Sequence, residues 1–315
     1  MNKSTPEAAS PLPLEGATPA ARQSRFRGVH WNGRRFGRWL AGSALIAFGL
    51  AGCASLDAQQ RKWIFQPSDR TWWGGAQAAE GMHDVWIEFG AAEATSPVKL
   101  HGLWLPQERA DAPVLLYLHG ARWDVRSSAH RMRRMHELGF AVLGIDYRGF
   151  GQSSAALPSE DLAHEDALAA WQWLAQRQPR AKRFVFGHSL GGAIAVRLAS
   201  EVEDAAGLIV EGSFTSIPEV FNTMRWGWLP LGPFITQRFD AASRIDKLKA
   251  PLLVVHGSDD SLIKPELGRA LYERARGPKR FVLVEGGTHY NTNAVGQVQY
   301  RQAVGDLFGL QVAHQ

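Results

Sequence analysis

The chain has 315 residues, of which 45% are hydrophobic and 21% charged. This composition is typical of a globular protein with enough apolar surface for a large core, and it excludes a wholly disordered or fibrous chain. The net charge is +5, but seven of the 35 basic and two of the 30 acidic residues precede residue 53. The rest carries 28 of each, and a neutral body argues against nucleic acid as a partner.

The first 52 residues are predicted to be a disordered leader followed by a lipoprotein signal peptide. Residues 1–33 are rich in Pro, Ala, Ser and Gly and have no apolar periodicity. Arg34, Arg35 and Arg38 then precede an apolar stretch over residues 39–50. A span of this length is too short to cross a bilayer, for which about 20 residues are needed, but it suits the hydrophobic region of a signal peptide.

The apolar stretch ends in Leu50-Ala51-Gly52-Cys53, which resembles a bacterial lipobox. In such proteins the cysteine is acylated, with palmitate among its fatty acids, and becomes the new N-terminus. This predicts a lipoprotein of the bacterial cell envelope that faces the periplasm and is held to the membrane by its lipid anchor. The alternatives are a short anchor helix that ends in cysteine, or a small buried apolar residue. As the only cysteine, Cys53 excludes an intrachain disulfide and a cysteine-based metal cluster.

Residues 53–82 form an aromatic-rich lead-in, and residues 83–315 alternate β-rich and helical stretches. The predicted strands are Val85–Phe89, Val98–Leu105, Val114–His119, Ala141–Asp146, Arg183–Phe186, Gly207–Val210, Leu252–His256 and Arg280–Val284. The predicted helices are Ser127–Leu138, Asp161–Gln176, Leu190–Ser200, Pro265–Ala275 and Tyr300–Phe308. Because nearly continuous apolar strands alternate with helices, an α/β fold with a mostly parallel sheet between helices is expected.

The fifth predicted strand runs into Gly187-His188-Ser189-Leu190-Gly191-Gly192, and a helix of small residues follows. This is G-x-S-x-G between a strand and a helix, the context in which a nucleophilic serine sits on a tight turn. Ser189 is therefore the candidate nucleophile; the alternative is a buried turn serine. The backbone N–H of Leu190 is one candidate oxyanion donor, and that of Ala121, after the third strand, is the other.

A serine hydroxyl needs a base that accepts its proton, and the base needs an acid to orient it. Among the eleven histidines, His289 follows the last strand, which is the expected place of the base; the alternative is a solvated loop histidine. The seventh strand ends in Asp259 and Asp260, which gives the chain order serine, aspartate, histidine. The order alone leaves the choice between the two aspartates open.

Residues 83–310 resemble the α/β-hydrolases, and within them the membrane-associated Bem46-like and mammalian ABHD13-like proteins. The resemblance rests on residues 145–153, the turn at Ser189, residues 212–217, residues 238–240 and residues 251–260. It implies an α/β-hydrolase fold, and it implies Asp260 as the acid, since the acid of this family usually stands four residues after the histidine of an H-G pair, here His256. Relatives often carry Asn at the position of Ala121, so this chain departs from the family there.

The resemblance also implies a short cap inserted at about residues 213–240, between the sixth strand and Asp240. This region contains several large apolar residues, which we expect to form a wall for an acyl chain or for the adjacent membrane: Trp226, Trp228, Leu229, Leu231 and Phe234. Ordinary packing of a small cap on the body is the alternative.

Together these features predict a serine hydrolase that cleaves small-molecule carboxylic esters or thioesters through an acyl-enzyme, with Ser189, Asp260 and His289 as a catalytic triad. No metal or organic cofactor is expected, because the chemistry needs none and the histidines form no ligand cluster in the sequence. A serine aminopeptidase or acyl-peptide hydrolase would use the same triad. A catalytically idle lipoprotein is the third possibility. The oligomeric state is left open.

Overall fold

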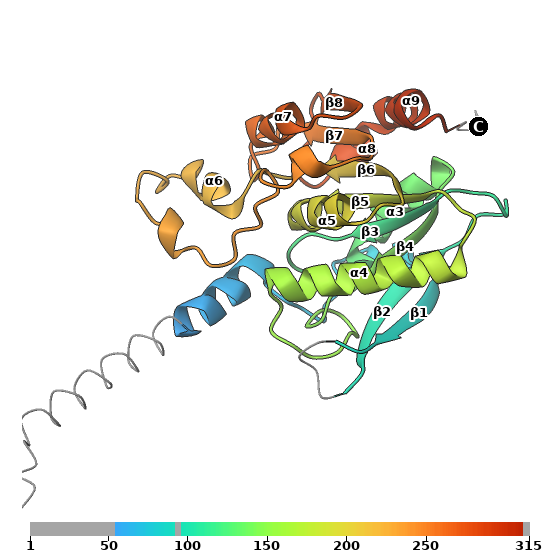
Figure 1. Ribbon diagram of the computed structural model, residues 1–315, viewed down its shortest axis with the longest axis horizontal. Helices are drawn as coiled ribbons and strands as arrows, with labels where there is room; N and C mark the ends of the chain where they lie inside the picture. Colours follow the sequence, from blue (N-terminus) through green and yellow to red (C-terminus); the bar gives the residue numbers. More distant parts are fainter. Residues whose placement is uncertain (1–53, 92–95, 311–315) are drawn as a thin grey trace, which may run out of the picture. The chain divides into compact units, whose positions relative to one another are not determined.

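The computed structural model of the chain describes residues 54–91 and 96–310, and a twisted sheet runs through the middle of this part (Figure 1). The strand order is β1-β2-β4-β3-β5-β6-β7-β8. The strands are β1 (His83–Phe89), β2 (Val98–Leu105), β3 (Val114–Leu118), β4 (Ala141–Ile145), β5 (Arg183–His188), β6 (Ala205–Glu211), β7 (Leu252–Gly257) and β8 (Lys279–Val284). β2 pairs antiparallel with β1 and β4, and all other neighbours are parallel, so the predicted mostly parallel sheet is confirmed.

Helices cover both faces of this sheet. The α-helices are α2 (Gly75–Ala78), α3 (Ala129–Glu137), α4 (Glu160–Arg177), α5 (Leu190–Glu201), α6 (Ile217–Asn222), α7 (Pro265–Arg274), α8 (Thr292–Val295) and α9 (Gln297–Phe308). The described part of the chain also has a helix over residues 54–65 and three short 3-10 turns: η1 (Val125–Ser128), η2 (Gly232–Phe234) and η3 (Ile245–Lys247). The helix expected over residues 127–138 is divided into η1 and α3, because the Asp124 carboxylate accepts the Ser127 N–H and begins η1 first.

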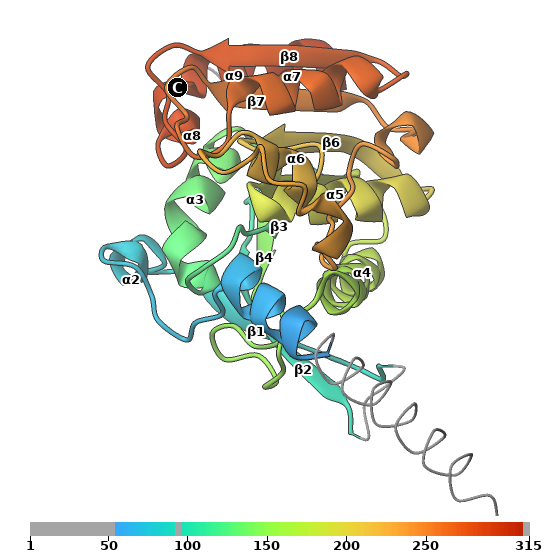
Figure 2. The same cartoon turned by 90° about the vertical axis from the view of Figure 1, so that its left-hand side faces the viewer.

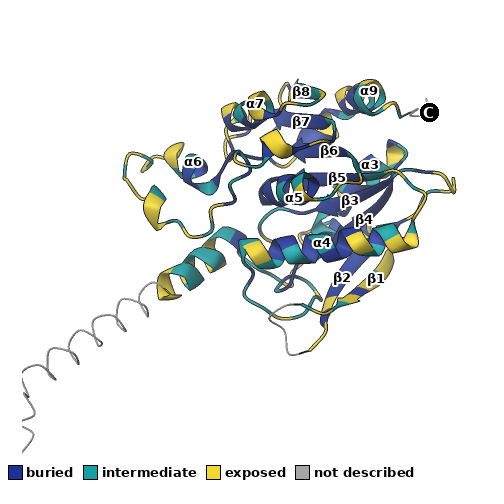
Figure 3. Cartoon of the chain, viewed as in Figure 1, coloured by how far each residue is buried: buried dark blue, intermediate teal, exposed yellow. Residues whose placement is uncertain are grey.

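Two hydrophobic cores lie on the two faces of the sheet (Figure 3). One contains residues of α4, α5 and α7, and the other contains residues of α2, α3 and α9. Every residue of β3, β4 and β7 is buried, as their apolar runs predicted. All the buried members of both cores lie between Phe65 and Val304, within the compact unit Ala51–Gln315.

The parallel strands bring the loops that follow β3, β5, β6, β7 and β8 to one edge of the sheet, where parallel α/β folds place their ligands. Figure 2 looks onto this edge, with α6 and the helical residues 54–65 in front. The predicted cap lies in the connection from β6 to β7 and contains α6 and η2. The lead-in was not expected to be helical, yet residues 54–65 form a helix whose last residue, Phe65, is fully buried in the core.

Candidate active site

The turn between β5 and α5 holds Ser189 in an unusual backbone conformation. Its φ is 55° and its ψ is −122°, a positive φ that residues other than glycine rarely adopt. The Ser189 N–H donates to the Glu211 carbonyl at 2.9 Å, which ties the turn to the end of β6. A Cβ on Gly187 would lie only 2.2 Å from the carbonyl oxygen of Gly191, so the turn can close this tightly only with glycine there. Strain held in this way is common at functional sites.

His289, in the loop after β8, lies next to this serine. Its Nε2 is 3.0 Å from Ser189 Oγ, and its Nδ1 is 2.8 Å from Asp260 Oδ2. Because a carboxylate can only accept, His289 Nδ1–H donates to Asp260, and Nε2 is left free to accept a proton. The three side chains come from three loops at one edge of the sheet and form a continuous chain of hydrogen bonds.

Asp260, and not Asp259, is the aspartate that contacts His289. Asp260 is 2% exposed, and its Oδ1 accepts the N–H groups of Leu262 and Ile263 at 3.0 and 2.8 Å. Burial raises the pKa of Asp260, but the hydrogen bonds from His256 and His289 outweigh burial and hold this pKa below its ordinary value. Asp259 is exposed and accepts a hydrogen bond from the Ser258 hydroxyl at 3.0 Å.

The two expected oxyanion donors lie on either side of the serine. Leu190 is the first residue of α5, and Ala121 follows Gly120, where an added Cβ would lie 3.1 Å from the Cβ of Ser189. Within the described ranges, the N–H groups of Ala121 and Leu190 make no hydrogen bond. Both are backbone donors, so the absence of the asparagine that relatives carry leaves this part of the site intact.

The lead-in holds the loop that carries Ala121. Arg122 and Trp123, the next two residues, have positive φ values of 67° and 58° and turn the chain back sharply. The Arg122 N–H donates to the Phe65 carbonyl at 2.9 Å, and the Asp124 N–H donates to the Arg70 carbonyl at 3.2 Å. The segment after residue 65 thus positions this loop, a role that its sequence did not indicate.

An ion pair between buried Glu211 and partly buried Arg131, which the sequence did not indicate, lies beside His289. Arg131 Nε donates to Glu211 Oε1 at 2.8 Å, and its Nη2 donates to the carbonyls of His289 and Tyr290, both at 3.1 Å. The hydroxyl of Tyr300 donates to the second oxygen of Glu211. The only signal in the sequence was an acidic residue that ends the apolar β6; Arg131, on a helix rich in basic residues, gave none.

Three other histidines near the edge support loops. His188 is turned away from the serine, as expected, and its Nε2 donates to the His289 carbonyl at 3.0 Å. Its burial, and next the charge of Arg131, hold the pKa of His188 well below its ordinary value, so His188 is neutral. His119 Nδ1 donates to the Gly120 carbonyl at 2.7 Å, and His256 Nε2 donates to the Ile263 carbonyl at 2.9 Å.

The apolar residues expected to line the cap face solvent instead of a closed cavity. Trp226, Trp228 and Phe234 are 57%, 74% and 63% exposed, and Leu229 is partly buried. Their contact with a substrate stays a prediction. The predicted signal peptide and Cys53 lie outside the described residues.

No group of three or more His, Cys, Asp or Glu side chains in the described part of the chain is placed to hold a metal ion. None of the helices described combines the length and the apolar composition that a membrane-spanning segment needs.

Comparison with known proteins yields one family model and several relatives. Residues 109–243 match the family described as serine aminopeptidase, S33. The chain is 32% identical over 249 residues to an uncharacterized protein of Mycobacterium tuberculosis, covering 78% of this chain and 85% of that one. It is 30% identical over 300 residues to the lysophosphatidylserine lipase ABHD12 of Danio rerio, covering 81% and 75%.

The esterase Pf2001 of Pyrococcus furiosus has a similar solved structure. The TM-score is 0.60 at 23% identity, over 78% of this chain and 99% of that one. At this level of identity the similarity concerns the fold.

Proposed function

This chain belongs to the α/β-hydrolase superfamily, and from that premise we propose that it is a serine hydrolase that cleaves carboxylic esters or thioesters through an acyl-enzyme. The observation that carries the proposal is the hydrogen-bonded chain from Ser189 through His289 to Asp260 at the carboxyl edge of the sheet. Its order and geometry are those of an activated nucleophile, its base and the acid that orients the base.

In the proposed reaction, Ser189 Oγ attacks the carbonyl carbon of the substrate while His289 Nε2 takes the hydroxyl proton. The carbonyl oxygen becomes an oxyanion and accepts hydrogen bonds from the N–H groups of Ala121 and Leu190. His289 then returns the proton to the leaving oxygen or sulfur, which departs and leaves the acyl group on Ser189. A water molecule, deprotonated by the same nitrogen, releases the acid. Asp260 keeps its hydrogen bond to Nδ1 throughout.

An acyl ester of a lipid is the substrate class that we favour. The lysophosphatidylserine lipases named ABHD12 are relatives with a stated activity, and they support a lipid ester as substrate. The finer assignment to the Bem46-like or ABHD13-like branch stays a prediction from the sequence motifs.

A fluorophosphonate probe tests the proposed chemistry without knowledge of the substrate. Its phosphorus takes the place of the acyl carbon, so reaction needs Ser189 and His289 in register. We expect the folded protein to be labelled at Ser189, and Ser189→Ala and His289→Ala to abolish labelling. A folded protein that stays unlabelled would favour the idle lipoprotein, and labelling at another serine would overturn the assignment of the site.

A serine aminopeptidase is the second candidate, because residues 109–243 match a family described by that activity. It would use the same triad on an amide bond. Turnover of acyl esters of graded chain length, measured beside aminoacyl amides, separates the two. We expect hydrolysis of the esters; preference for the amides would transfer the proposal to the peptidase.

We also propose that Cys53 carries the lipid anchor, on the evidence of the lipobox-like residues 50–53 and the apolar stretch before them. In a bacterial host, the wild-type protein should fractionate with membranes, and Cys53→Ala should lose its acyl groups. Because the modified cysteine of a lipoprotein carries more than one chain, attachment should be stable. A mature protein that retains residues upstream of Cys53 would contradict this proposal.

A further inference from the structure

Several of the large exposed apolar side chains belong to loops at the edge that holds Ser189. Trp123 follows β3, the cap residues follow β6, and Tyr290, which is 70% exposed, follows β8. Because β3, β6 and β8 are parallel members of one sheet, their following loops share this edge. Trp226 and Trp228, exposed by more than half, would be costly on a surface that faces only water, and large exposed apolar side chains grouped in this way favour an interaction site.

The helix of residues 54–65 extends the same surface. Gln60 Nε2 donates to the Phe234 carbonyl at 2.7 Å, and Gln60 Oε1 accepts the Thr236 N–H at 2.9 Å, so the helix is fastened to the cap. On this helix Leu56 and Trp63, 46% and 68% exposed, are seven residues apart and share one face. We call Leu56, Trp63, Trp226, Trp228 and Phe234 the rim surface.

The cap segment that carries the rim tryptophans is positively charged. Between residues 221 and 239 the only charged residues are Arg225 and Arg238, and Lys62 stands beside Trp63 on the helix. The Arg225 guanidinium lies 5.8 Å from the ring centre of Trp226. Tryptophan beside basic residues is the composition of segments that lie in the interface of an anionic bilayer, where the rings occupy the headgroup level and the cations attract acidic lipids.

The position of Cys53 next to this helix in the sequence favours a membrane over a protein as the partner of the rim surface. The described part of the helix that carries Leu56 and Trp63 starts at residue 54, next in the chain to Cys53, the residue proposed for acylation. An anchor at that point would hold the rim surface against the bilayer to which the chain is attached. A bilayer also accommodates side chains spread over separate loops, since it needs no matched shape.

We propose that the rim surface binds to the interface of an anionic lipid bilayer, so that the edge carrying Ser189 faces the membrane. Binding to the bilayer is argued from the described surface and its charge, and the choice of a membrane over a protein partner also rests on the acylation proposed for Cys53. Its consequence, that the substrate is an acyl lipid taken directly from the bilayer, rests on the proposed function.

Vesicle binding of the unacylated protein tests this proposal. The chain from residue 53 onward with Cys53→Ser keeps every buried core residue and lacks the anchor. We expect it to sediment with vesicles of phosphatidylcholine plus phosphatidylglycerol, and more weakly with phosphatidylcholine alone. Trp226→Gln together with Trp228→Gln should lower the partition coefficient by about tenfold or more, the cost of withdrawing a large apolar side chain from an apolar environment.

Matched control variants test whether the loss of vesicle binding is specific to the rim surface. Trp86→Gln removes another exposed tryptophan, 45% exposed, on the edge strand β1, and should leave binding unchanged. Arg225→Gln with Arg238→Gln should abolish the preference for anionic vesicles, whereas Lys247→Gln, before β7, should retain it. If the double tryptophan variant does not fold, Trp63→Gln on the separate helix provides the same test.

Three results would overturn the proposal. The first is a wild-type protein that does not bind vesicles. The second is a set of rim variants that bind like the wild type. The third is a concentration-dependent dimer that the rim variants abolish, which would assign the rim surface to contact with a second copy of the chain. Ser189→Ala should bind vesicles like the wild type. Binding and fluorophosphonate labelling therefore fail independently, and loss of one does not imply loss of the other.

Discussion

At the scale of single residues, the two neighbouring aspartates after β7 differ in what surrounds them. The chain reverses direction there, so consecutive side chains point to different sides. Asp260 is buried against His289 and receives two backbone N–H groups, whereas Asp259 faces solvent. Only Asp260, which is buried and in contact with the imidazole, can hold His289 in one tautomer.

The substitution Asp260→Asn should therefore lower the rate of fluorophosphonate labelling and of ester turnover by about 10⁴-fold while the fold is kept. The amide can donate to His289 Nδ1 and would favour the tautomer in which Nε2 carries a proton and cannot accept one. Asp259→Asn is the matched control and should change the rate little. The reverse outcome, a silent Asp260→Asn and an inactive Asp259→Asn, would refute the assignment.

Arg131 acts on His289 only through the backbone, so we class it as a positioning residue. Arg131→Met should lower the free energy of unfolding by about 3–5 kcal/mol, because it leaves the Glu211 carboxylate buried without its partner. Adding Glu211→Gln removes that unpaired charge and should recover most of the stability. Labelling should stay slow in the double variant, since the His289 carbonyl has lost its guanidinium.

This comparison separates positioning from stability. Urea unfolding gives the stability of each variant. The labelling rate is measured without urea, under conditions in which all variants are folded to the same extent. A double variant that labels as fast as the wild type would show that the ion pair serves the fold alone.

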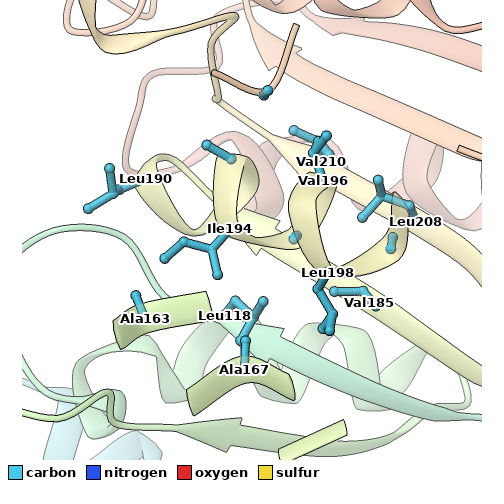
Figure 4. Packing of buried hydrophobic residues seen from close by; sticks show 14 of the residues in the cluster. Leu118, Ala163, Ala167, Val185, Leu190, Ile194, Val196, Leu198, Leu208 and Val210 are labelled. Carbon is cyan, nitrogen blue, oxygen red and sulfur yellow. The ribbon is translucent and has the colours of Figure 1, made fainter. Parts of the chain in front are cut away.

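At the scale of elements, helix α5 places the serine because its first turns are made of small residues. Ile194 and Leu198 pack toward α4 and β3, and Val196 packs beside β6 (Figure 4). The approach is close at Gly192, where an added Cβ would lie 2.4 Å from Ser213 Oγ and 2.5 Å from its Cβ. Ser213 is fully buried and has no room to withdraw.

We therefore expect Gly192→Ala to lower the free energy of unfolding by about 1–3 kcal/mol, the usual cost of overpacking, and to slow labelling of Ser189. Gly305→Ala in α9 is the matched control. Its new methyl group would meet only the Leu310 carbonyl at 3.6 Å, an ordinary contact. It should raise stability by up to about 1 kcal/mol through helix propensity. Chemical denaturation of both variants provides the measurement, and equal effects would contradict the packing argument.

At the scale of the whole molecule, the buried histidines couple folding to protons. Burial lowers the pKa of His119 and His188, so both stay neutral in the folded protein, whereas the unfolded chain protonates them below about pH 6.5. Because the unfolded state then binds more protons, their contribution to stability is complete above that pH and is lost as the pH falls. His101 has the opposite sign: although its burial acts to lower its pKa, hydrogen bonds with Asp146 and Asp84 raise it, so its contribution is lost as the pH rises.

The free energy of unfolding should accordingly fall on acidification below about pH 6.5, by at most about 1.4 kcal/mol per pH unit for each of the two neutral histidines. The variants His119→Asn and His188→Asn should each flatten this dependence. His83→Asn, at an exposed position, is the control and should leave the slope unchanged. Denaturant titrations across this pH range measure the slopes; slopes that match the wild type would contradict the linkage.

Local patterns in the sequence predict the architecture and the turn that carries the candidate nucleophile. Strands buried on both faces need continuous apolar runs, and these are visible locally, so the pattern predicts all eight strands and the helices α3, α4, α5, α7 and α9 with small differences at their ends, but not the helix of residues 54–65. The turn at Ser189 is also local, because glycines at fixed spacing are what permit its close contacts. The position of His289 follows from the chain order.

Contacts between distant residues were decided only by the tertiary structure. The contact of Asp260 with His289 depends on side-chain directions, and in the sequence only the family resemblance points to Asp260. Arg131 and Glu211 are 80 residues apart and meet only once α3 is folded beside β6.

The helix of residues 54–65 is the clearest case of such dependence. It has no complete apolar stripe, and its polar residue Gln60 makes hydrogen bonds with the cap, 174 residues further along the chain. The spacing of apolar residues along the sequence predicts which residues of a helix or strand are buried, because this depends only on composition and on the period of the element. Which partners satisfy a buried charge, and which apolar residues stay exposed around the site, depends on how separate segments pack, and that is known only after the chain has folded.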